Sequence, residues 1–262
     1  MSRSRVALDD GAYTTVERWG ERGPVVLAVH GMTSSRLSWE RLARHLDGRF
    51  RVFAYDQRGH GDSAEITGPM SLERGVRDFR NVAESIGEPI DLAIGHSWGG
   101  AVAVMAGLRT PVSRVAAIDP MLHQVAAQWY GEYVAELAEQ FANAGQARDA
   151  IVREEYAQWH PLDVEAKVHA VHAMTVAPIE GLLSENPRAN WDLLPSIERY
   201  DKPLLLAMAA EGESINDDAA LLALRTRIPP LVEVVTFPGA GHNLHRTQFD
   251  AFAEVLDRFL NR

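Results

Sequence analysis

Short, continuously apolar runs alternate with amphipathic stretches along much of the chain. Short, mostly apolar runs predict strands at residues 25–29, 51–55, 90–94, 112–118, 204–208 and 231–237. The run at residues 25–29 is continuously apolar and rich in β-branched residues, so it predicts a strand buried on both faces. Apolar positions at helical spacing predict helices between them, around residues 39–46, 72–83, 101–108, 219–224 and 249–259. Residues 6–8 and 14–19 flank Asp9-Asp10-Gly11 and predict an opening hairpin. Strands that alternate with helices predict an α/β protein with a mostly parallel central sheet flanked by helices.

This alternation stops at Pro120 and resumes near residue 196. The intervening part shows apolar stripes at helical spacing and no strand pattern. The stripes are Tyr130, Val134, Leu137 and Phe141; Val152, Tyr156 and Trp159; and Val164, Val168, Val171 and Met174. We therefore predict a core domain made of residues 1–119 and 196–262, with residues 120–195 inserted as a helical cap.

Composition narrows the class of protein. A formal charge of −10 over 262 residues argues against nucleic acid as a partner, because such binding relies on basic patches. The absence of cysteine excludes disulfides, thiolate metal sites and a cysteine nucleophile. Acidic residues precede any apolar stretch suited to a signal peptide, and no apolar run is long enough to cross a bilayer. We expect a soluble, cytoplasmic protein without a membrane partner.

The segment Gly95-His96-Ser97-Trp98-Gly99 carries the most specific chemical signal. It matches the pattern G-x-S-x-G and lies between a predicted strand and a predicted helix, which is the context of a nucleophile elbow. The glycines remove side chains that would clash in the tight turn, and the following helix offers unpaired N–H groups. The alternative interpretation is a glycine-rich turn with an incidental serine.

Three further motifs accompany the elbow in a fixed order. They are His30-Gly31-Met32, the pattern Asp56-x-Arg58-Gly59-x-Gly61-x-Ser63, and Gly239-Ala240-Gly241-His242-Asn243. With these motifs the chain resembles the serine hydrolases of the α/β-hydrolase fold that carry a helical cap. The resemblance implies that Ser97 is the nucleophile and that His242, in the loop after the last strand, is its general base.

The resemblance also implies an oxyanion hole formed by the backbone N–H groups of Met32 and Trp98. Their side chains are expected to belong to an apolar acyl-binding wall. His30 is expected to support the oxyanion loop from beneath, and His96 to pack under the elbow. His245 is expected at a helix start or at the pocket rim, and Arg58 in a salt bridge.

The acid of the triad is where this sequence departs from the usual pattern. Family members commonly place an aspartate in a turn after the strand that follows the cap, but Gly212 stands at that spacing here. Some relatives supply the acid one strand earlier, where this chain has Asp119. We therefore predict Asp119 as the acid that orients His242. Glu213 and Glu211 remain the alternatives.

The predicted activity is hydrolysis of a carboxylic ester through an acyl-enzyme. Two alternatives stay open: hydrolysis of a C–C bond or a lactone with the same triad, and a non-catalytic ligand-binding receptor of the same fold. No cofactor or metal is expected, and His169 and His172 are interpreted as surface residues. The predicted partner is a small, mostly apolar ester, because bulky apolar residues of the cap are expected to face Ser97. These residues are Trp129, Tyr130, Phe141, Trp159 and Met174.

Overall fold

The computed structural model describes residues 1–65, 68–123, 132, 135–139, 141, 145–172, 174–186 and 191–262. Its centre is an eight-stranded sheet with the strand order β1-β2-β4-β3-β5-β6-β7-β8. The strands are β1 (Ser2–Ala7), β2 (Tyr13–Trp19), β3 (Val25–Val29), β4 (Arg51–Tyr55), β5 (Ile90–His96), β6 (Val112–Ile118), β7 (Leu204–Met208) and β8 (Val232–Thr236).

The predicted mostly parallel sheet is confirmed. The pairs from β4 to β8 along the sheet are parallel, whereas the β1–β2 and β2–β4 pairs are antiparallel. Strand β1 begins at Ser2, earlier than predicted, because it pairs with β2 along its whole length, from Ser2 opposite Arg18 to Ala7 opposite Tyr13. This edge strand is mostly exposed and polar, so its first residues carry no apolar signal.

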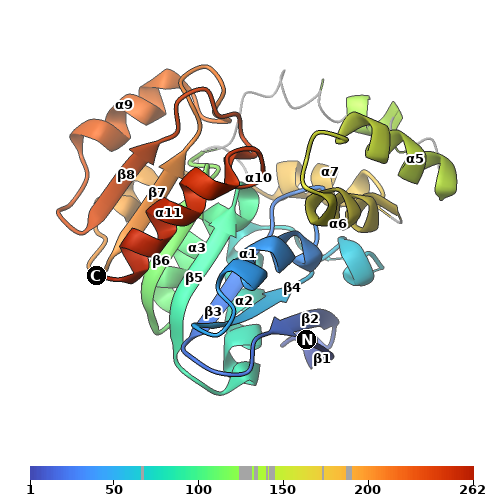
Figure 1. The fold of residues 1–262 in the computed structure, drawn as a ribbon, viewed down its shortest axis with the longest axis horizontal. Helices are drawn as coiled ribbons and strands as arrows, with labels where there is room; N and C mark the ends of the chain where they lie inside the picture. The colour runs from blue at the N-terminus through green and yellow to red at the C-terminus, as the bar shows by residue number, and fades with distance from the viewer. Residues whose placement is uncertain are drawn as a thin grey trace.

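Helices cover both faces of the sheet (Figure 1), as the β/α alternation predicts. One face packs against α2 (Leu72–Ile86), α3 (Trp98–Arg109), α8 (Leu194–Ile197) and α9 (Asp218–Thr226). The other face packs against α1 (Glu40–His45) and α11 (Phe249–Leu260). Alternate residues of β3 point to the two faces: Val25, Leu27 and Val29 to the first, and Val26 and Ala28 to the second. Three short helices lie near the ends of strands, namely η1 (Arg36–Trp39), η2 (Gly61–Ser63) and α10 (Leu244–Thr247).

Between β6 and α8 the chain leaves the sheet, and we call residues 120–195 the cap segment. Its described helices are α5 (Gln146–Glu155), α6 (Pro161–His172) and α7 (Ala177–Glu185). Helices α5 and α6 pack against each other beside the sheet (Figure 1), and α6 contacts η1, η2 and α1. Val152, Val168 and Val171 form a small apolar core of their own with Ala170. The only β pairing in the described part of this segment is a single bridge between His123 and Asp192.

One predicted stripe of the cap segment differs from the structure, and another lies partly outside the described residues. The stripe Val152, Tyr156 and Trp159 is not one helix, because α5 ends at Glu155 and the other two residues lie in the turn before α6. Tyr130 and Val134 of the first stripe, and Trp129 beside them, lie outside the described residues. The boundaries of the core and cap domains stay a prediction.

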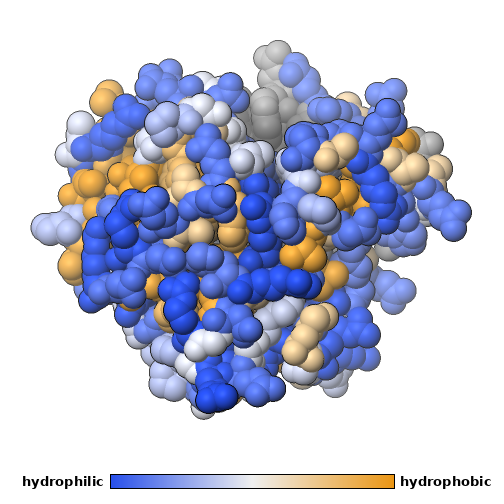
Figure 2. All heavy atoms as spheres, viewed as in Figure 1, coloured by the Kyte–Doolittle hydropathy of each residue, from blue (hydrophilic) through white to orange (hydrophobic). Residues whose placement is uncertain are grey.

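The face of the molecule in Figure 2 is mostly hydrophilic. Hydrophilic residues form most of the face shown in Figure 2, and apolar residues occur in small groups between them. Among the helices of the described residues, none combines the length and the apolar character that a membrane span requires.

Candidate active site

Ser97 lies at the sharp junction between β5 and α3. Its backbone angles, φ 56° and ψ −121°, are strained for a residue with a side chain. Two glycines make the junction possible. A Cβ on Gly95 would lie 2.0 Å from the carbonyl oxygen of Gly99, and a Cβ on Gly99 would lie 2.3 Å from that of His30. The G-x-S-x-G spacing therefore reflects backbone segments that touch at both glycines.

Asp119 and His242 are 123 positions apart in the sequence and form a hydrogen bond in the structure. Asp119 follows β6 and has a positive φ of 38°, and His242 lies in the loop between β8 and α10. The Nδ1 atom of His242 lies 2.7 Å from Oδ2 of Asp119. Because a carboxylate only accepts, Nδ1 carries the hydrogen in this bond and Nε2 is left as the basic nitrogen.

The Asp119 carboxylate is fully buried, and protein donors take the place of water around it. Oδ1 accepts hydrogen bonds from the Ala209 N–H at 3.2 Å and the Ser214 hydroxyl at 2.7 Å. Oδ2 accepts a further bond from the Ile215 N–H at 3.1 Å. Ser214 therefore supports the Asp119–His242 pair, a role for which the sequence carries no motif.

The two glutamates considered as alternatives are placed differently. Glu211 and Glu213 are both exposed, and Glu211 lies 3.8 Å from Arg225. Gly212 between them adopts a left-handed turn conformation with φ 79°. Within the described residues, Asp119 is the carboxylate that contacts His242. The geometry therefore favours Asp119 over either glutamate.

The two predicted oxyanion residues lie on either side of the elbow loop in sequence, Trp98 directly after Ser97 and Met32 after β3. Trp98 is the first residue of α3, and its N–H has no acceptor among the described residues. Met32 follows His30-Gly31 in the loop after β3 and lines the pocket. The Trp98 side chain departs from the prediction, because the indole is buried edge-on against Trp191, with ring centroids 5.1 Å apart, and does not line the pocket.

His30 lies in the interior as a neutral side chain beneath the loop that contains Met32. Its Nε2 accepts from the Gln57 N–H at 3.0 Å, so Nδ1 carries the hydrogen and donates to the Gly31 carbonyl at 2.8 Å. Burial lowers the pKa of His30 from 6.5 to about 4. The position agrees with the role that the resemblance implies.

Two other histidines pack beneath His242. The rings of His96 and His242 lie 4.6 Å apart, and those of His96 and His245 lie 4.4 Å apart. The Nε2–H of His96 donates to the carbonyl of His242 at 3.0 Å. Burial lowers the pKa of both His96 and His245 well below 6.5, so both stay uncharged. His245 lies in α10 as predicted, but it is buried and does not line the pocket rim.

Ser97 and His242 line a cavity of about 660 Å³ between the sheet and the cap segment. Apolar residues line part of this cavity, namely Met32, Leu137, Tyr156, Trp159 and Ile215. Of the bulky cap residues expected to face Ser97, Trp159 is among them, whereas Phe141 and Met174 are not. Hydroxyl, amide, histidine, acidic and cationic side chains line the rest. The sequence did not predict the buried Lys167 and Arg246 among them.

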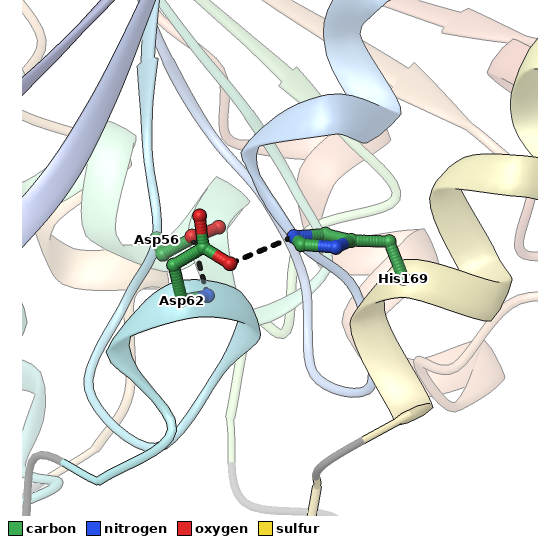
Figure 3. Close-up of side chains that lie close together, drawn as sticks. All are labelled: Asp56, Asp62 and His169. Atoms are coloured by element: carbon green, nitrogen blue, oxygen red, sulfur yellow. Dashed lines mark hydrogen bonds and ion pairs between the residues drawn. The ribbon is translucent and has the colours of Figure 1, made fainter. Parts of the chain in front are cut away.

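A second group of polar residues lies outside the cavity, where Asp56 and Asp62 approach His169 of α6 (Figure 3). Three such side chains could in principle bind a metal ion. The buried guanidinium of Arg36 already contacts Asp56 at 2.5 Å and Asp62 at 2.9 Å, and would repel a cation. We interpret the group as an ion-pair network that joins α6 to the core.

The predicted ion pair of Arg58 is confirmed. Its Nε atom lies 2.7 Å from the Asp78 carboxylate.

Comparison with known proteins agrees with this architecture. The family model described as the alpha/beta hydrolase family matches residues 25–255. The chain belongs to the alpha/beta hydrolase family. The resemblance drawn from the motifs is therefore confirmed at the level of the family and of the fold.

Within the alpha/beta hydrolase family, one similar curated protein is 2-(acetamidomethylene)succinate hydrolase from Mesorhizobium japonicum. It is 27% identical over 97% of this chain and 94% of its own length. The crystal structure of an E-2-(acetamidomethylene)succinate hydrolase superposes with a TM-score of 0.82 and 21% identity, covering 100% of this chain and 99% of the other. An N-formylmaleamic acid deformylase from Pseudomonas putida S16 gives a TM-score of 0.76 and 19% identity, over 97% and 100% of the two chains. The two solved structures show the shared fold. The family model and the curated relative support hydrolysis as the general activity.

Proposed function

We propose that this protein is a serine hydrolase that cleaves a carboxylic ester through a triad of Ser97, His242 and Asp119. The observation that carries the proposal is the 2.7 Å contact between His242 Nδ1 and the buried Asp119 carboxylate, in a cavity that Ser97 also lines. A serine on a strained elbow, a histidine and a buried acid are the groups that acyl transfer requires.

The chemistry follows from the roles of these groups. His242 Nε2 takes the proton of the Ser97 hydroxyl as its oxygen attacks the acyl carbon, and the Asp119 carboxylate stabilises the resulting imidazolium. The N–H groups of Met32 and Trp98 stabilise the negative charge on the acyl oxygen. The imidazolium then protonates the leaving alcohol. Water, activated by the same nitrogen, attacks the acyl-enzyme and releases the acid and free Ser97.

The cap segment is proposed to complete the substrate pocket. Tyr156, Trp159 and Lys167 of this segment line the cavity together with Met32 and Ser97 of the core. An apolar part of an ester would pack against Met32 and the two aromatic side chains. Residues 120–195 would thereby act as the inserted cap, with residues 1–119 and 196–262 as the catalytic core.

A second candidate is hydrolysis of an amide. The name of the Mesorhizobium japonicum relative gives a succinate bearing an acetamido group as its substrate. The same triad can form an acyl-enzyme from an amide, provided that His242 protonates the leaving nitrogen. Lactones and 1,3-diketones, the latter through C–C cleavage, remain further substrates within reach of these groups.

The proposal is tested with a fluorophosphonate probe and a substrate panel. The wild-type protein should be labelled stoichiometrically, and mass spectrometry of the digest should place the label on Ser97. Ser97→Ala should take up no label and lose hydrolysis by several orders of magnitude. Because the Ser97 side chain projects from the elbow and packs little, the thermal midpoint of the Ser97→Ala protein should differ little from that of the wild type. Rates on matched esters, amides, lactones and diketones then identify the bond that is cleaved.

Two outcomes would count against the proposal. Near-normal turnover by purified Ser97→Ala would remove Ser97 from the mechanism. A wild-type protein that takes up no fluorophosphonate and hydrolyses none of the panel would favour the ligand-binding alternative.

A further inference from the structure

Lys167 of α6 is a buried lysine whose hydrogen-bond acceptors among the described residues are uncharged. Only 7% of its surface is exposed, yet it lines the cavity that contains Ser97. Its Nζ donates to the Thr33 carbonyl at 3.0 Å and to the Thr33 hydroxyl at 2.9 Å. Its partners are therefore neutral groups. Burial lowers the pKa of Lys167 from 10.5 to about 7, because the charged ammonium is less stable away from water than the neutral amine.

Arg246 of α10 is a second buried cation in the same cavity. It is 6% exposed, donates to the Ser34 hydroxyl at 3.0 Å, and lies over the Trp159 ring at 4.7 Å. Its Nε has no hydrogen-bond partner within the described residues, where no carboxylate forms an ion pair with Arg246 either. The negative charge of buried Asp163 acts on Arg246, but the Asp163 carboxylate forms its ion pair with Arg41. Within the described residues the buried guanidinium of Arg246 therefore lacks the direct ion pair that normally accompanies such a group.

The two cations are anchored beside the reacting centre. Thr33 and Ser34 are consecutive residues, and they directly follow Met32, whose N–H is proposed to bind the acyl oxygen. The charge of Arg246 also acts on Lys167 and lowers its pKa further. One short loop therefore supports the oxyanion site and both cations.

The acidic side chains of the cavity wall are arranged in the opposite way. Glu136, Glu155, Glu213 and Asp217 are exposed, so water screens their charge. Glu155 is the acid whose charge acts on Lys167, and the net effect on Lys167 is still a lowered pKa. Positive charge thus lies in the buried part of the cavity wall, and negative charge lies on its exposed part.

We propose that Lys167 and Arg246 form a subsite for a carboxylate, so that the substrate is an acyl compound carrying a second, free carboxylate near the scissile carbonyl. This inference rests on the proposed acyl hydrolysis and names its substrate class. The substrate carboxylate supplies the direct ion pair that no described acidic side chain forms with either cation, and the Lys167 ammonium and Arg246 guanidinium bind it with charge-assisted hydrogen bonds. A half-ester of a short dicarboxylic acid fits this description.

The test compares two esters of the same shape. The two molecules differ only at the end of the acyl chain, where monoethyl succinate has a carboxylate and ethyl 4-methylpentanoate has an isopropyl group of similar shape. The wild-type protein should hydrolyse the anionic ester at least about tenfold faster in kcat/KM. Lys167→Met should lower kcat/KM for the anionic ester by at least about tenfold and change that for the neutral ester by less than about threefold. Lys167→Arg should retain the preference, because it keeps the charge.

A matched control and a binding measurement complete the design. Lys202→Met removes a lysine that is hydrogen-bonded to Val112 and lies outside the cavity, and the ratio of the two rates should stay that of the wild type. Succinate binding to Ser97→Ala, measured by calorimetry, tests the subsite without any turnover. It should be lost in the Ser97→Ala, Lys167→Met double variant. Arg246→Gln should weaken the same binding.

The outcomes separate the two proposals. Succinate binding that depends on Lys167, in a protein that hydrolyses no ester, keeps the carboxylate subsite and rejects ester hydrolysis. Equal or faster hydrolysis of the neutral ester by the wild type rejects the subsite and keeps the triad, whatever the variants do. An equal loss on both esters in Lys167→Met, with succinate binding intact, assigns Lys167 to holding the cap segment on the core and also rejects the subsite.

Discussion

Asp119 shows how one residue of the candidate site depends on its surroundings. A carboxylate with no exposed surface is expensive to hold unless donors surround it. The N–H groups of Ala209 and Ile215, the Ser214 hydroxyl and His242 Nδ1 together provide them. The same carboxylate can then hold the imidazole in the orientation that leaves Nε2 free for Ser97.

We expect Asp119→Asn to lower turnover severely and to leave the fold intact. The amide has the same shape but no charge, and it can select the wrong imidazole tautomer; the analogous change in serine proteases costs about ten-thousand-fold. Glu211→Gln and Glu213→Gln, on the exposed turn, should cost less than about tenfold, or about 1.4 kcal/mol of barrier. The measurement is kcat/KM of the three variants on one ester. A mild Asp119→Asn with a crippling glutamate variant would transfer the role to that glutamate.

At the scale of elements, the elbow depends on contact between backbones. Helix α3 begins so close to β3 that Gly99 touches the carbonyl groups of Val29 and His30. This approach brings the start of α3, where Trp98 lies, next to the end of β3, which leads into the loop that contains Met32. The position of the proposed oxyanion hole is therefore set by how closely two elements pack.

We expect Gly99→Ala to destabilise the protein more than an alanine at a glycine in open space. Its Cβ would lie 2.3 Å from two backbone carbonyl oxygens, which cannot rotate away as a side chain could. The free energy of unfolding should fall by about 3 kcal/mol or more. Gly48→Ala serves as the control, because Gly48 has a positive φ but no atom within 4 Å of its Cβ position, and it should cost about 1 kcal/mol. Denaturant unfolding of both variants provides the comparison, and equal losses would contradict the packing argument.

At the scale of the whole molecule, the fold keeps several histidines in its interior as neutral groups. Burial lowers the pKa of His30 to about 4 and that of His60 to about 3, and it lowers those of His96 and His245 as well. The unfolded chain binds protons at these positions near pH 6.5, whereas the folded chain does not. Stability must therefore fall as the pH falls through this region.

We expect the free energy of unfolding to decrease as the pH is lowered from about 6.5 to about 5. Each such histidine contributes a slope approaching about 1.4 kcal/mol per pH unit, once the unfolded state is protonated and the folded state is not. Urea unfolding at a series of pH values measures the slope. His60→Gln should reduce this slope by close to the contribution of one histidine. A free energy of unfolding that does not depend on pH over this range would contradict the assignment.

Local patterns were enough to predict most of the fold and part of the candidate site. The alternation of buried strands and amphipathic helices depends on neighbouring residues, so it predicted the parallel sheet and its two helical layers. The family resemblance rested on four local motifs, and it led to the predictions of Ser97, His242 and the two oxyanion residues. The polar edge strand β1 and the end of α5 were predicted less well, because pairing and turn geometry, more than periodicity, decide them.

The features that only the tertiary structure decided all join distant parts of the chain. Asp119 and His242 are separated by 123 residues, Lys167 and Thr33 by 134, and Arg246 and Ser34 by 212. No local pattern records such contacts, since each depends on how strand ends, loops and the cap segment come together. The sequence therefore predicted an apolar pocket from bulky cap residues. Folding buried two cations in that pocket, because α6 and α10 both pack against the loop that follows β3.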